Sequence, residues 1–178
     1  MNKQKNVVIF LVKFFATYFV IFAIYATYLN NSQEKTPKFK TASITTLVAD
    51  QTVSLLDFFG YDAGAFQHKE ELSVKLIIDS SYTARVIEGC NAISIIILFI
   101  AFIVAFSGTL KATLIYVILG SIFIYFINIV RIAFLAVMIY KHPNQQEFLH
   151  NLVFPAIIYG TVFLLWVFWV NKFSNYKK

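Results

Sequence analysis

The chain has 178 residues, of which 59% are hydrophobic and only 13% are charged. Soluble domains usually carry about 25% charged residues, so this composition excludes an ordinary soluble domain and indicates an integral membrane protein. The net charge of +6 arises at the ends of apolar segments, without a basic patch interleaved with aromatic residues, and therefore predicts no nucleic-acid partner.

Four apolar segments are predicted to span the membrane, because a transmembrane helix needs roughly 20 apolar residues to cross about 30 Å of hydrocarbon. They are Asn6–Leu29, Asn91–Ser107, Ala112–Tyr140 and His150–Val170. The first has a basic start, but its apolar stretch is longer than the roughly 7–15 residues of a signal-peptide core, and no A-x-A site follows it. It is therefore expected to remain as an uncleaved anchor.

Positive charges assign the orientation of these spans. If both termini and the link between the second and third spans share one side, that side holds six lysines and no acidic residue, and the other side holds all nine acidic residues. The six lysines are Lys3, Lys5, Lys111, Lys172, Lys177 and Lys178. An excess of Lys and Arg in short loops marks the cytoplasm. Both termini are thus predicted to be cytoplasmic, in a multi-pass membrane protein.

The segment 30–89 is expected outside the cytoplasm. Residues 30–42 are polar, include a proline and are typical of a linker. Ser43–Phe59 has apolar residues mostly at helical spacing, which predicts an amphipathic helix that ends at Gly60. The stretch 71–90 alternates in part between apolar and polar residues, which predicts a short hairpin. The predicted fold is an all-α integral membrane protein, a four-transmembrane-helix bundle with a small α+β extracytoplasmic segment between helices one and two.

Three polar residues lie at the outer ends of separate predicted spans. Cys90, the only cysteine, opens the second span, Arg131 lies in the outer half of the third, and His150 opens the fourth. An arginine inside a span costs several kcal/mol, usually faces the bundle interior and marks function. Asn128, one turn earlier, lies on the same face. A cationic neighbour and a helix N-terminus both favour a nucleophilic thiolate, and a histidine distant in sequence is a candidate base for it.

Each of these residues also has a simpler interpretation. Arg131 could extend its side chain toward the headgroups, a lone cysteine is most often a small buried residue, and His150 could cap an interfacial helix. His142, in the outer loop, is the reserve candidate for the base, whereas His68 has the setting of a solvated surface residue. One cysteine permits no intrachain disulfide, and the scattered histidines give no metal-ligand spacing.

The order Cys, Arg, His at the outer ends of successive spans resembles the exosortase/archaeosortase family of membrane-embedded cysteine transpeptidase-like enzymes. The matching motifs are EGCNAIS around Cys90, NIVRIAF around Arg131 and HNLVFPA from His150, so the resemblance covers about residues 80–170. The short chain and the EGCN context are most similar to the small Bacteroidetes type F exosortase. Many members have Ser-Gly after the cysteine, where this chain has Asn-Ala, and many have more spans.

The resemblance implies a cysteine-type peptidase or transpeptidase that cleaves the C-terminal sorting signal of exported proteins at the outer face of the membrane. That signal comprises a short motif, a transmembrane helix and a basic tail. The implied roles are Cys90 as nucleophile, Arg131 as stabiliser of the oxyanion and His150 as general base and acid. The supporting residues are Glu88, Asn91 and Asn128, the first and last of them to orient the histidine or the arginine. No cofactor or metal is expected. The expected partners are the exported substrates, membrane lipid, and an accessory membrane protein or a second copy of the chain.

The predicted organisation has three parts: an N-terminal transmembrane anchor over 1–29, an extracytoplasmic linker and cap over 30–89, and a catalytic membrane core of three transmembrane helices over 90–178. Two other functions fit the same sequence. The chain would be a non-catalytic scaffold or assembly subunit for envelope proteins if its cysteine were dispensable. It would be a small transporter if Arg131 bound an anionic solute, a function that favours broken helices inside the membrane.

Overall fold

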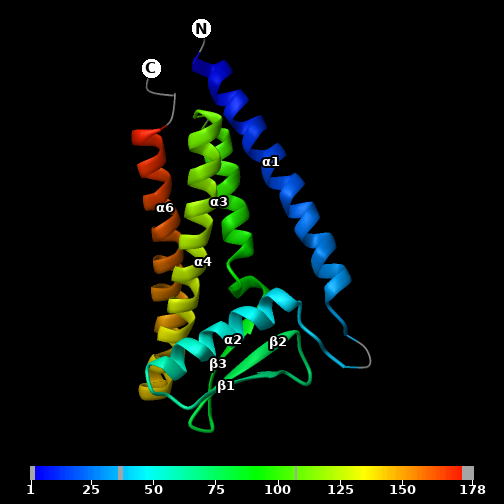
Figure 1. Ribbon diagram of the computed structural model, residues 1–178, viewed down its shortest axis with the longest axis vertical. Helices are drawn as coiled ribbons and strands as arrows, with labels where there is room; N and C mark the ends of the chain where they lie inside the picture. The colour runs from blue at the N-terminus through cyan, green and yellow to red at the C-terminus, as the bar shows by residue number, and fades with distance from the viewer. Residues whose placement is uncertain (1–2, 36–37, 107, 174–178) are drawn as a thin grey trace.

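The computed structural model describes residues 3–35, 38–106 and 108–173. The residues interpreted above that lie outside these ranges are Pro37 of the linker, Ser107 at the end of the second predicted span, Lys177 and Lys178. Figure 1 shows long helices with both chain termini at one end, and a small cap of one helix and three strands at the other.

Three helices in the described part of the chain are long and apolar enough to cross a membrane. They are α1 (Lys3–Ser32), α4 (Leu110–Lys141) and a helical run over 143–172 that ends in α6 (Phe154–Lys172). The first, third and fourth predicted spans are therefore confirmed as apolar helices of sufficient length. The last begins several residues before His150, where the sequence predicts its start.

The second predicted span is shorter than expected. α3 (Ile93–Ala105) has 13 residues, which cover about 20 Å at 1.5 Å per residue, whereas the hydrocarbon is about 30 Å thick. The helix is strongly apolar and packs against α1, α4 and α6. A bundle of four full-length spans is therefore not confirmed, and α3 is a short helix embedded among three longer ones.

The amphipathic helix of the cap is confirmed. α2 (Ser43–Phe58) ends where the sequence predicts, and Gly60 just beyond it has a φ of +85°. The backbone N–H groups of Gly60 and Tyr61 donate hydrogen bonds to carbonyls in the last turn of α2. A left-handed residue, usually Gly, makes these bonds possible at the C-terminus of a helix.

The predicted hairpin forms two strands of a three-stranded antiparallel sheet with the order β1-β2-β3. β2 (Ser73–Ile78) and β3 (Ser81–Ile87) are joined by Asp79 and Ser80, both with positive φ, as two-residue hairpin turns require. β1 (Ala63–Gln67) pairs with the other edge of β2. The sequence does not predict β1, because Ala and Gly have low strand propensity.

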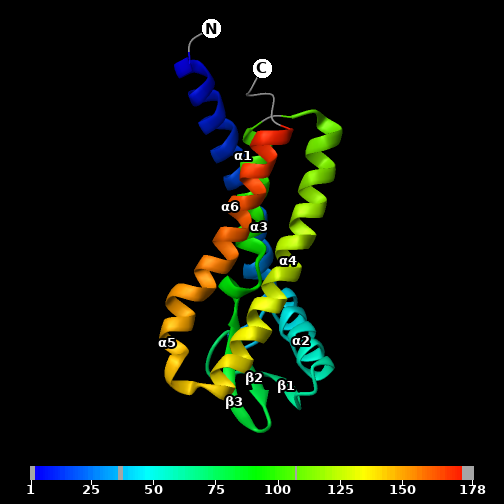
Figure 2. The same cartoon turned by 90° about the vertical axis from the view of Figure 1, so that its left-hand side faces the viewer.

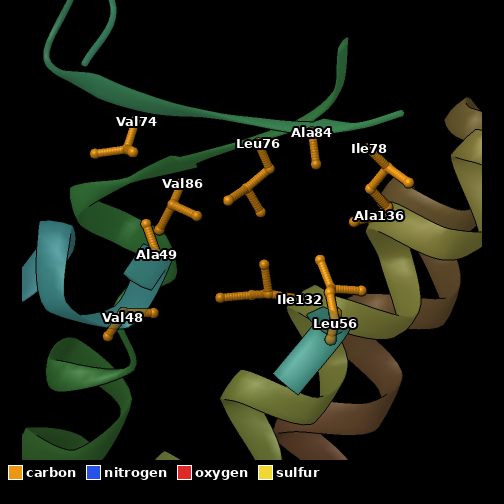
Figure 3. Close-up of a cluster of buried hydrophobic side chains, with 11 residues drawn as sticks. Val48, Ala49, Leu56, Val74, Leu76, Ile78, Ala84, Val86, Ile132 and Ala136 are labelled. Carbon is orange, nitrogen blue, oxygen red and sulfur yellow. The ribbon is translucent and has the colours of Figure 1, made fainter. Parts of the chain in front are cut away.

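Two clusters of buried apolar side chains hold the fold together. The cap cluster lies where α2 and the sheet meet α4, as Figure 3 shows. Its members are Val48, Ala49, Leu56, Val74, Leu76, Ile78, Ala84, Val86, Ile132, Ala133 and Ala136. The bundle cluster joins α3, α4 and α6, and its members are Ala92, Phe99, Ile103, Ile124, Ile158, Val162 and Trp169. Because α4 contributes to both clusters, the cap packs directly on a helix of the apolar bundle.

Candidate active site

One cavity receives side chains from three separate helical segments. Cys90 ends a short 3₁₀ turn, η1 (Glu88–Cys90), Arg131 lies on α4, and His150 lies in a π-helical turn, η3 (Leu149–Val153). All three line a cavity of about 200 Å³. Figure 2 shows the last helical run, from α5 into α6, alongside α4, with the cap at the lower end of the molecule. The structure thus brings together the thiol, the guanidinium and the imidazole that the sequence predicts to meet.

Hydrogen bonds fix the backbone around Cys90. The Asn128 amide donates to the carbonyl oxygen of Cys90 over 2.8 Å. The side-chain oxygen of Asn91 accepts the backbone N–H of Ile93, at the start of α3, over 3.1 Å. Asn91 is fully buried and Asn128 is 1% exposed, so both bonds form where the local dielectric strengthens them. Two of the predicted supporting residues therefore hold the segment that carries the cysteine.

Glu88 does not orient the histidine or the arginine, which corrects the role predicted for it. Its carboxylate accepts hydrogen bonds from the Ala42 backbone N–H over 2.9 Å and from the Thr45 hydroxyl. A negative charge is favoured at this position because it lies at the N-terminus of α2. The Asn91 amide donates both to Glu88 and to the hydroxyl of Tyr25 on α1. Glu88 therefore ties the Cys90 turn to α1 and α2, away from the cavity.

Arg131 is a partly buried cation without a carboxylate partner in the described part of the chain. Its electrostatic neighbours are the Cys90 thiol and the hydroxyl of Tyr159 on α6. A charge inside a helical bundle is costly unless another group compensates it. The arrangement therefore suits a negative charge on the thiol, or one that forms beside it during a reaction.

His150 lies within a helical run rather than at its first residue. The run continues from α5 (Gln146–Phe148) through η3 into α6. A π-helical turn is an irregularity that is frequent at functional sites, and here it carries the histidine. The side chain of His150 is exposed, and its Nδ1 lies 3.4 Å from the side-chain oxygen of Asn151. His150 is thus accessible from outside while it lines the cavity.

The other two histidines lie away from the cavity. His142 follows the last residue of α4 and is exposed, and it does not line the cavity. His68 lies in the cap, where its Nε2 is 3.1 Å from a carboxylate oxygen of Glu71. The placement of the three residues favours His150 over the reserve candidate His142 as the partner of the thiol.

Ala92 has a backbone conformation that favours glycine. Its φ is 67° and its ψ is −10°, and its side chain is buried in the bundle cluster. A left-handed conformation costs roughly 1–2 kcal/mol for a residue with a Cβ atom. The resemblance described above places Ala92 where a Ser-Gly pattern would have glycine, and the structure shows that alanine takes the left-handed conformation there with strain.

A wider groove of about 650 Å³ opens beside the cavity, between β3 and the segment that follows α4. The groove and the cavity share Arg85, Leu135 and His150 as lining residues. Arg85 donates two hydrogen bonds, of 2.8 and 2.9 Å, to the carboxylate of Glu71. Partial burial raises the pKa of the Tyr82 phenol in this groove, against the opposing effect of Arg85.

Three further hydroxyl groups at or next to the site do not stand out in the sequence. Tyr159 lines the cavity beside Arg131, and Tyr25 and Thr45 bond to Asn91. The available signal is a hydroxyl group within an otherwise apolar helix. That signal does not identify the partner, because the partners lie on other helices and many residues away.

Comparison with known proteins gives one match. The family model described as transmembrane exosortase (Exosortase_EpsH) matches residues 7–170, which include Cys90, Arg131 and His150 as well as most of α1. No curated protein and no solved structure matches the chain. Because the matched region covers most of the sequence, the chain belongs to the transmembrane exosortase family.

Proposed function

We propose that this exosortase is a cysteine transpeptidase that cleaves the C-terminal sorting tail of exported proteins and transfers the cleaved protein to a surface acceptor. The observation that carries the proposal is the shared cavity, which receives the thiol of Cys90, the guanidinium of Arg131 and the imidazole of His150. A nucleophile, a base and a fixed positive charge are the groups that acyl transfer requires.

The first half of the reaction forms a thioester. The thiolate of Cys90 attacks the scissile carbonyl carbon, and the negative charge moves to the carbonyl oxygen, where Arg131 stabilises it. The tetrahedral intermediate collapses as the C–N bond breaks. His150, protonated when it took the thiol proton, gives that proton to the leaving amine. The tail departs with a new N-terminus, and the exported protein remains attached to Cys90.

The second half of the reaction restores the thiol. An acceptor amine, another acceptor nucleophile or water gives a proton to His150 and attacks the thioester carbonyl. The C–S bond then breaks, the Cys90 sulfur leaves as thiolate, and His150 returns the proton to it, which restores the starting thiol and neutral imidazole. No redox step and no external reductant is involved. The accessible position of His150, which also lines the wider groove, supports an acceptor that enters from outside.

The proposed orientation puts the cap and the cavity at the outer face of a bacterial inner membrane, with both termini in the cytoplasm. It rests on the excess of lysine in short cytoplasmic segments. The basic tail of the substrate would then lie on the cytoplasmic side and its transmembrane helix beside the bundle. Protease protection of tags at the two termini, measured in right-side-out and inverted vesicles, tests this orientation.

The decisive test uses cells that produce the wild-type chain or the Cys90→Ala variant. We expect at least one exported protein with a C-terminal apolar helix and a basic end to accumulate uncleaved in Cys90→Ala cells. With the wild-type chain, rapid acid quenching should trap this protein on Cys90 as a hydroxylamine-sensitive adduct. If every such protein is processed equally in both cells, the proposed enzymatic function is wrong.

Two histidine variants form a matched pair for the same assay. His150→Ala should lower the cleavage rate by about 10²–10⁴-fold, the usual contribution of general acid–base catalysis. His142→Ala should leave the rate within about twofold, because the side chain does not line the cavity. Arg131→Ala is expected to lower cleavage by about 10²–10³-fold, the typical loss when one oxyanion donor is removed. Equal effects of the two histidine variants would contradict the assignment of the base.

A further inference from the structure

The outer edge of β3 is free to pair with another strand. In the sheet, β3 is an edge strand that pairs only with β2. Within the described ranges, no backbone group of β3 bonds to any other segment. Such an edge carries unpaired N–H and C=O groups, which other strands can bind.

The wider groove runs along this strand. Four consecutive residues of β3, from Tyr82 to Arg85, line it, and the segment after α4 supplies a largely polar opposite wall. Leu135 and Ile139 of α4 complete the lining. The wall residues there are Pro143, Asn144, Gln146, Glu147, His150 and Asn151. A groove with a strand as one wall and polar side chains as the other suits an extended peptide, whose main chain supplies affinity and whose alternate side chains enter the walls.

The groove leads into the cavity that contains Cys90. Arg85 and His150 line both spaces, and β3 continues through η1 directly to Cys90. A one-residue irregularity at Thr83 interrupts the pairing of β2 with β3. An added strand would therefore find a regular backbone to pair with mainly at Ala84–Ile87, the part of β3 nearest to the thiol.

We propose that the segment of the exported protein on the N-terminal side of the scissile bond binds as an added strand along the free edge of β3. The inference rests on the proposed function, because it takes the peptide to be the substrate of Cys90. In the proposed orientation, β3 runs from the outer hairpin toward α3, and the substrate chain runs from outside toward its own transmembrane helix. The added strand is therefore parallel to β3, and its last residues reach the cavity.

Strand geometry gives this binding mode a register. Tyr82 and Ile87 are 55% and 41% exposed and mark the outer and inner parts of β3. With one residue taken up by the irregularity at Thr83, they are separated by about four strand steps of about 3.3 Å each. Substrate positions that approach Tyr82 should therefore lie roughly four residues farther from the scissile bond than those that approach Ile87.

Disulfide mapping tests the inference, and the test is simple because Cys90 is the chain's only cysteine. Tyr82→Cys or Ile87→Cys is introduced into the Cys90→Ala chain, so that the new thiol is the only one. The probe is the exported protein that accumulates uncleaved in Cys90→Ala cells, with single cysteines at successive positions before its transmembrane helix. A matched control is Phe66→Cys, on the opposite edge strand β1, where the side chain is 57% exposed.

The expected result is cross-linking at every second substrate position, because side chains on one face of a strand recur with a period of two. Positions linked to Tyr82→Cys should lie farther from the scissile bond than those linked to Ile87→Cys, and Phe66→Cys should give little product. A helical period, the reverse order, or equal cross-linking through Phe66→Cys would overturn the inference while the proposed function stands. If no exported protein depends on Cys90, both are wrong.

A second variant separates the groove from the catalytic cavity. Asn144→Trp places a bulky side chain in the groove wall, at an exposed position that does not line the cavity. We expect substrate cleavage to fall at least tenfold, while alkylation of Cys90 by iodoacetamide keeps its wild-type rate. Cleavage at the wild-type rate would contradict the inference. Unchanged cleavage together with a changed ratio of transfer to hydrolysis would also contradict it. That result would mean that the groove binds the acceptor and not the substrate.

Discussion

Only one of the two polar atoms in the Asn128 side chain has a hydrogen-bond partner among the described residues. Its amide nitrogen donates to the Cys90 carbonyl over 2.8 Å, whereas its side-chain oxygen is buried and has no hydrogen-bond partner in the described part of the chain. A buried acceptor without a partner costs about 1–3 kcal/mol. Asn128 also lines the cavity, so a substrate N–H group is a suitable donor for this oxygen. The residue thus connects the position of the nucleophile with the binding of the peptide.

Asn128→Ala should slow catalysis more than it unfolds the protein. Loss of the bond to the Cys90 carbonyl should lower the free energy of unfolding by about 1–3 kcal/mol and reduce the cleavage rate by at least tenfold. Thermal unfolding in detergent and substrate cleavage measure the two effects. The control Asn30→Ala, at an exposed position near the end of α1 that lines neither the cavity nor the groove, should alter neither. A normal cleavage rate in Asn128→Ala would contradict the positioning role.

Ala92 should tolerate glycine and reject a branched side chain. Ala92→Gly removes the left-handed strain of roughly 1–2 kcal/mol but also a buried methyl group worth about 0.8 kcal/mol, so its stability should stay within about 1 kcal/mol of wild type. Ala92→Val adds a β-branched side chain at the same positive φ and should lower stability by more than about 2 kcal/mol, because this backbone strain adds to the usual cost of about 1–3 kcal/mol for overpacking a core. Unfolding measurements on the three proteins decide the outcome.

The site residues were predictable where their residue type is rare in apolar helices. Cysteine and arginine stand out in apolar helices, so the sequence predicts that Cys90 and Arg131 share a site with a histidine, and the structure places them with His150 in one cavity. The role of Glu88 was not predictable in this way. Its partners, Ala42 and Thr45, lie more than 40 residues earlier, and only the folded cap brings them to the carboxylate.

The contact between α3 and α4 depends on the absence of a side chain at Gly120. A Cβ atom there would lie 2.4 Å from Cζ of Phe99, which is fully buried in the bundle cluster. Small residues let helices approach closely, and this is the main source of helix association in membranes. The contact joins α3, which follows the Cys90 turn, to α4, which carries Arg131.

Gly120→Ala should therefore weaken the bundle although alanine favours helices. Overpacking of this kind typically costs about 1–3 kcal/mol, and the variant should unfold at lower temperature in detergent. Phe99→Leu in the same chain should restore part of the loss, because it removes the ring that the new methyl group meets. Gly160→Ala is the matched control, since no atom lies within 4 Å of its added Cβ. Equal stability of the two glycine variants would refute the close contact.

Elements were predictable where periodicity or apolar length is strong. The long helices and α2 follow from such patterns, and Gly60 marks the end of α2 as its φ of +85° requires. β1 has the sequence Ala-Gly-Ala-Phe-Gln, which has no strand pattern of its own and forms by pairing with β2. The start of the last helical run was also missed, because the polar residues 143–148 contain no apolar repeat although they are helical.

A buried polar network joins the cap, the first helix and the cysteine turn into one unit. The Asn91 amide donates to Tyr25 on α1, to Thr45 on α2 and to Glu88 within the turn. Such a network stabilises one arrangement when all its members are bonded and is costly when one is removed. The position of the nucleophile is therefore linked to the packing of segments on both sides of the proposed membrane boundary.

Thr45→Val should expose this link. The substitution keeps the shape of the side chain but leaves Glu88 and Asn91 with one bond fewer, and it should lower stability by about 1–3 kcal/mol. Cleavage should fall as well, because the turn that carries Cys90 loosens. Thr46→Val, at the exposed neighbouring position, should have a smaller effect on both measurements. A fully active and stable Thr45→Val protein would show that the network does not hold the nucleophile.

The length of α4 connects the two halves of the molecule. Its 32 residues cover about 48 Å at 1.5 Å per residue, which exceeds the hydrocarbon thickness of about 30 Å. Because of this extra length, the last turns of α4, with Ile132 and Ala136, pack against the cap and form part of the cap cluster. The overall division into bundle and cap was predictable from charge and hydropathy. The sharing of α4 between them was not predictable, because a helix face that contacts lipid and a helix face that packs on a sheet have the same apolar composition.

The packing of α4 on the sheet has a consequence for biosynthesis. The sheet is translated before the helix that covers it, and Ile132 follows Val86 by a delay of roughly 2–9 s at the usual rate of about 5–20 residues per second. In the proposed orientation, the newly exported strands have only α2 packed on them during that interval, and the apolar surface that α4 later covers is exposed to water. A nascent chain in this state is vulnerable to aggregation and to quality-control proteases, and it would depend on envelope chaperones until the later helix arrives.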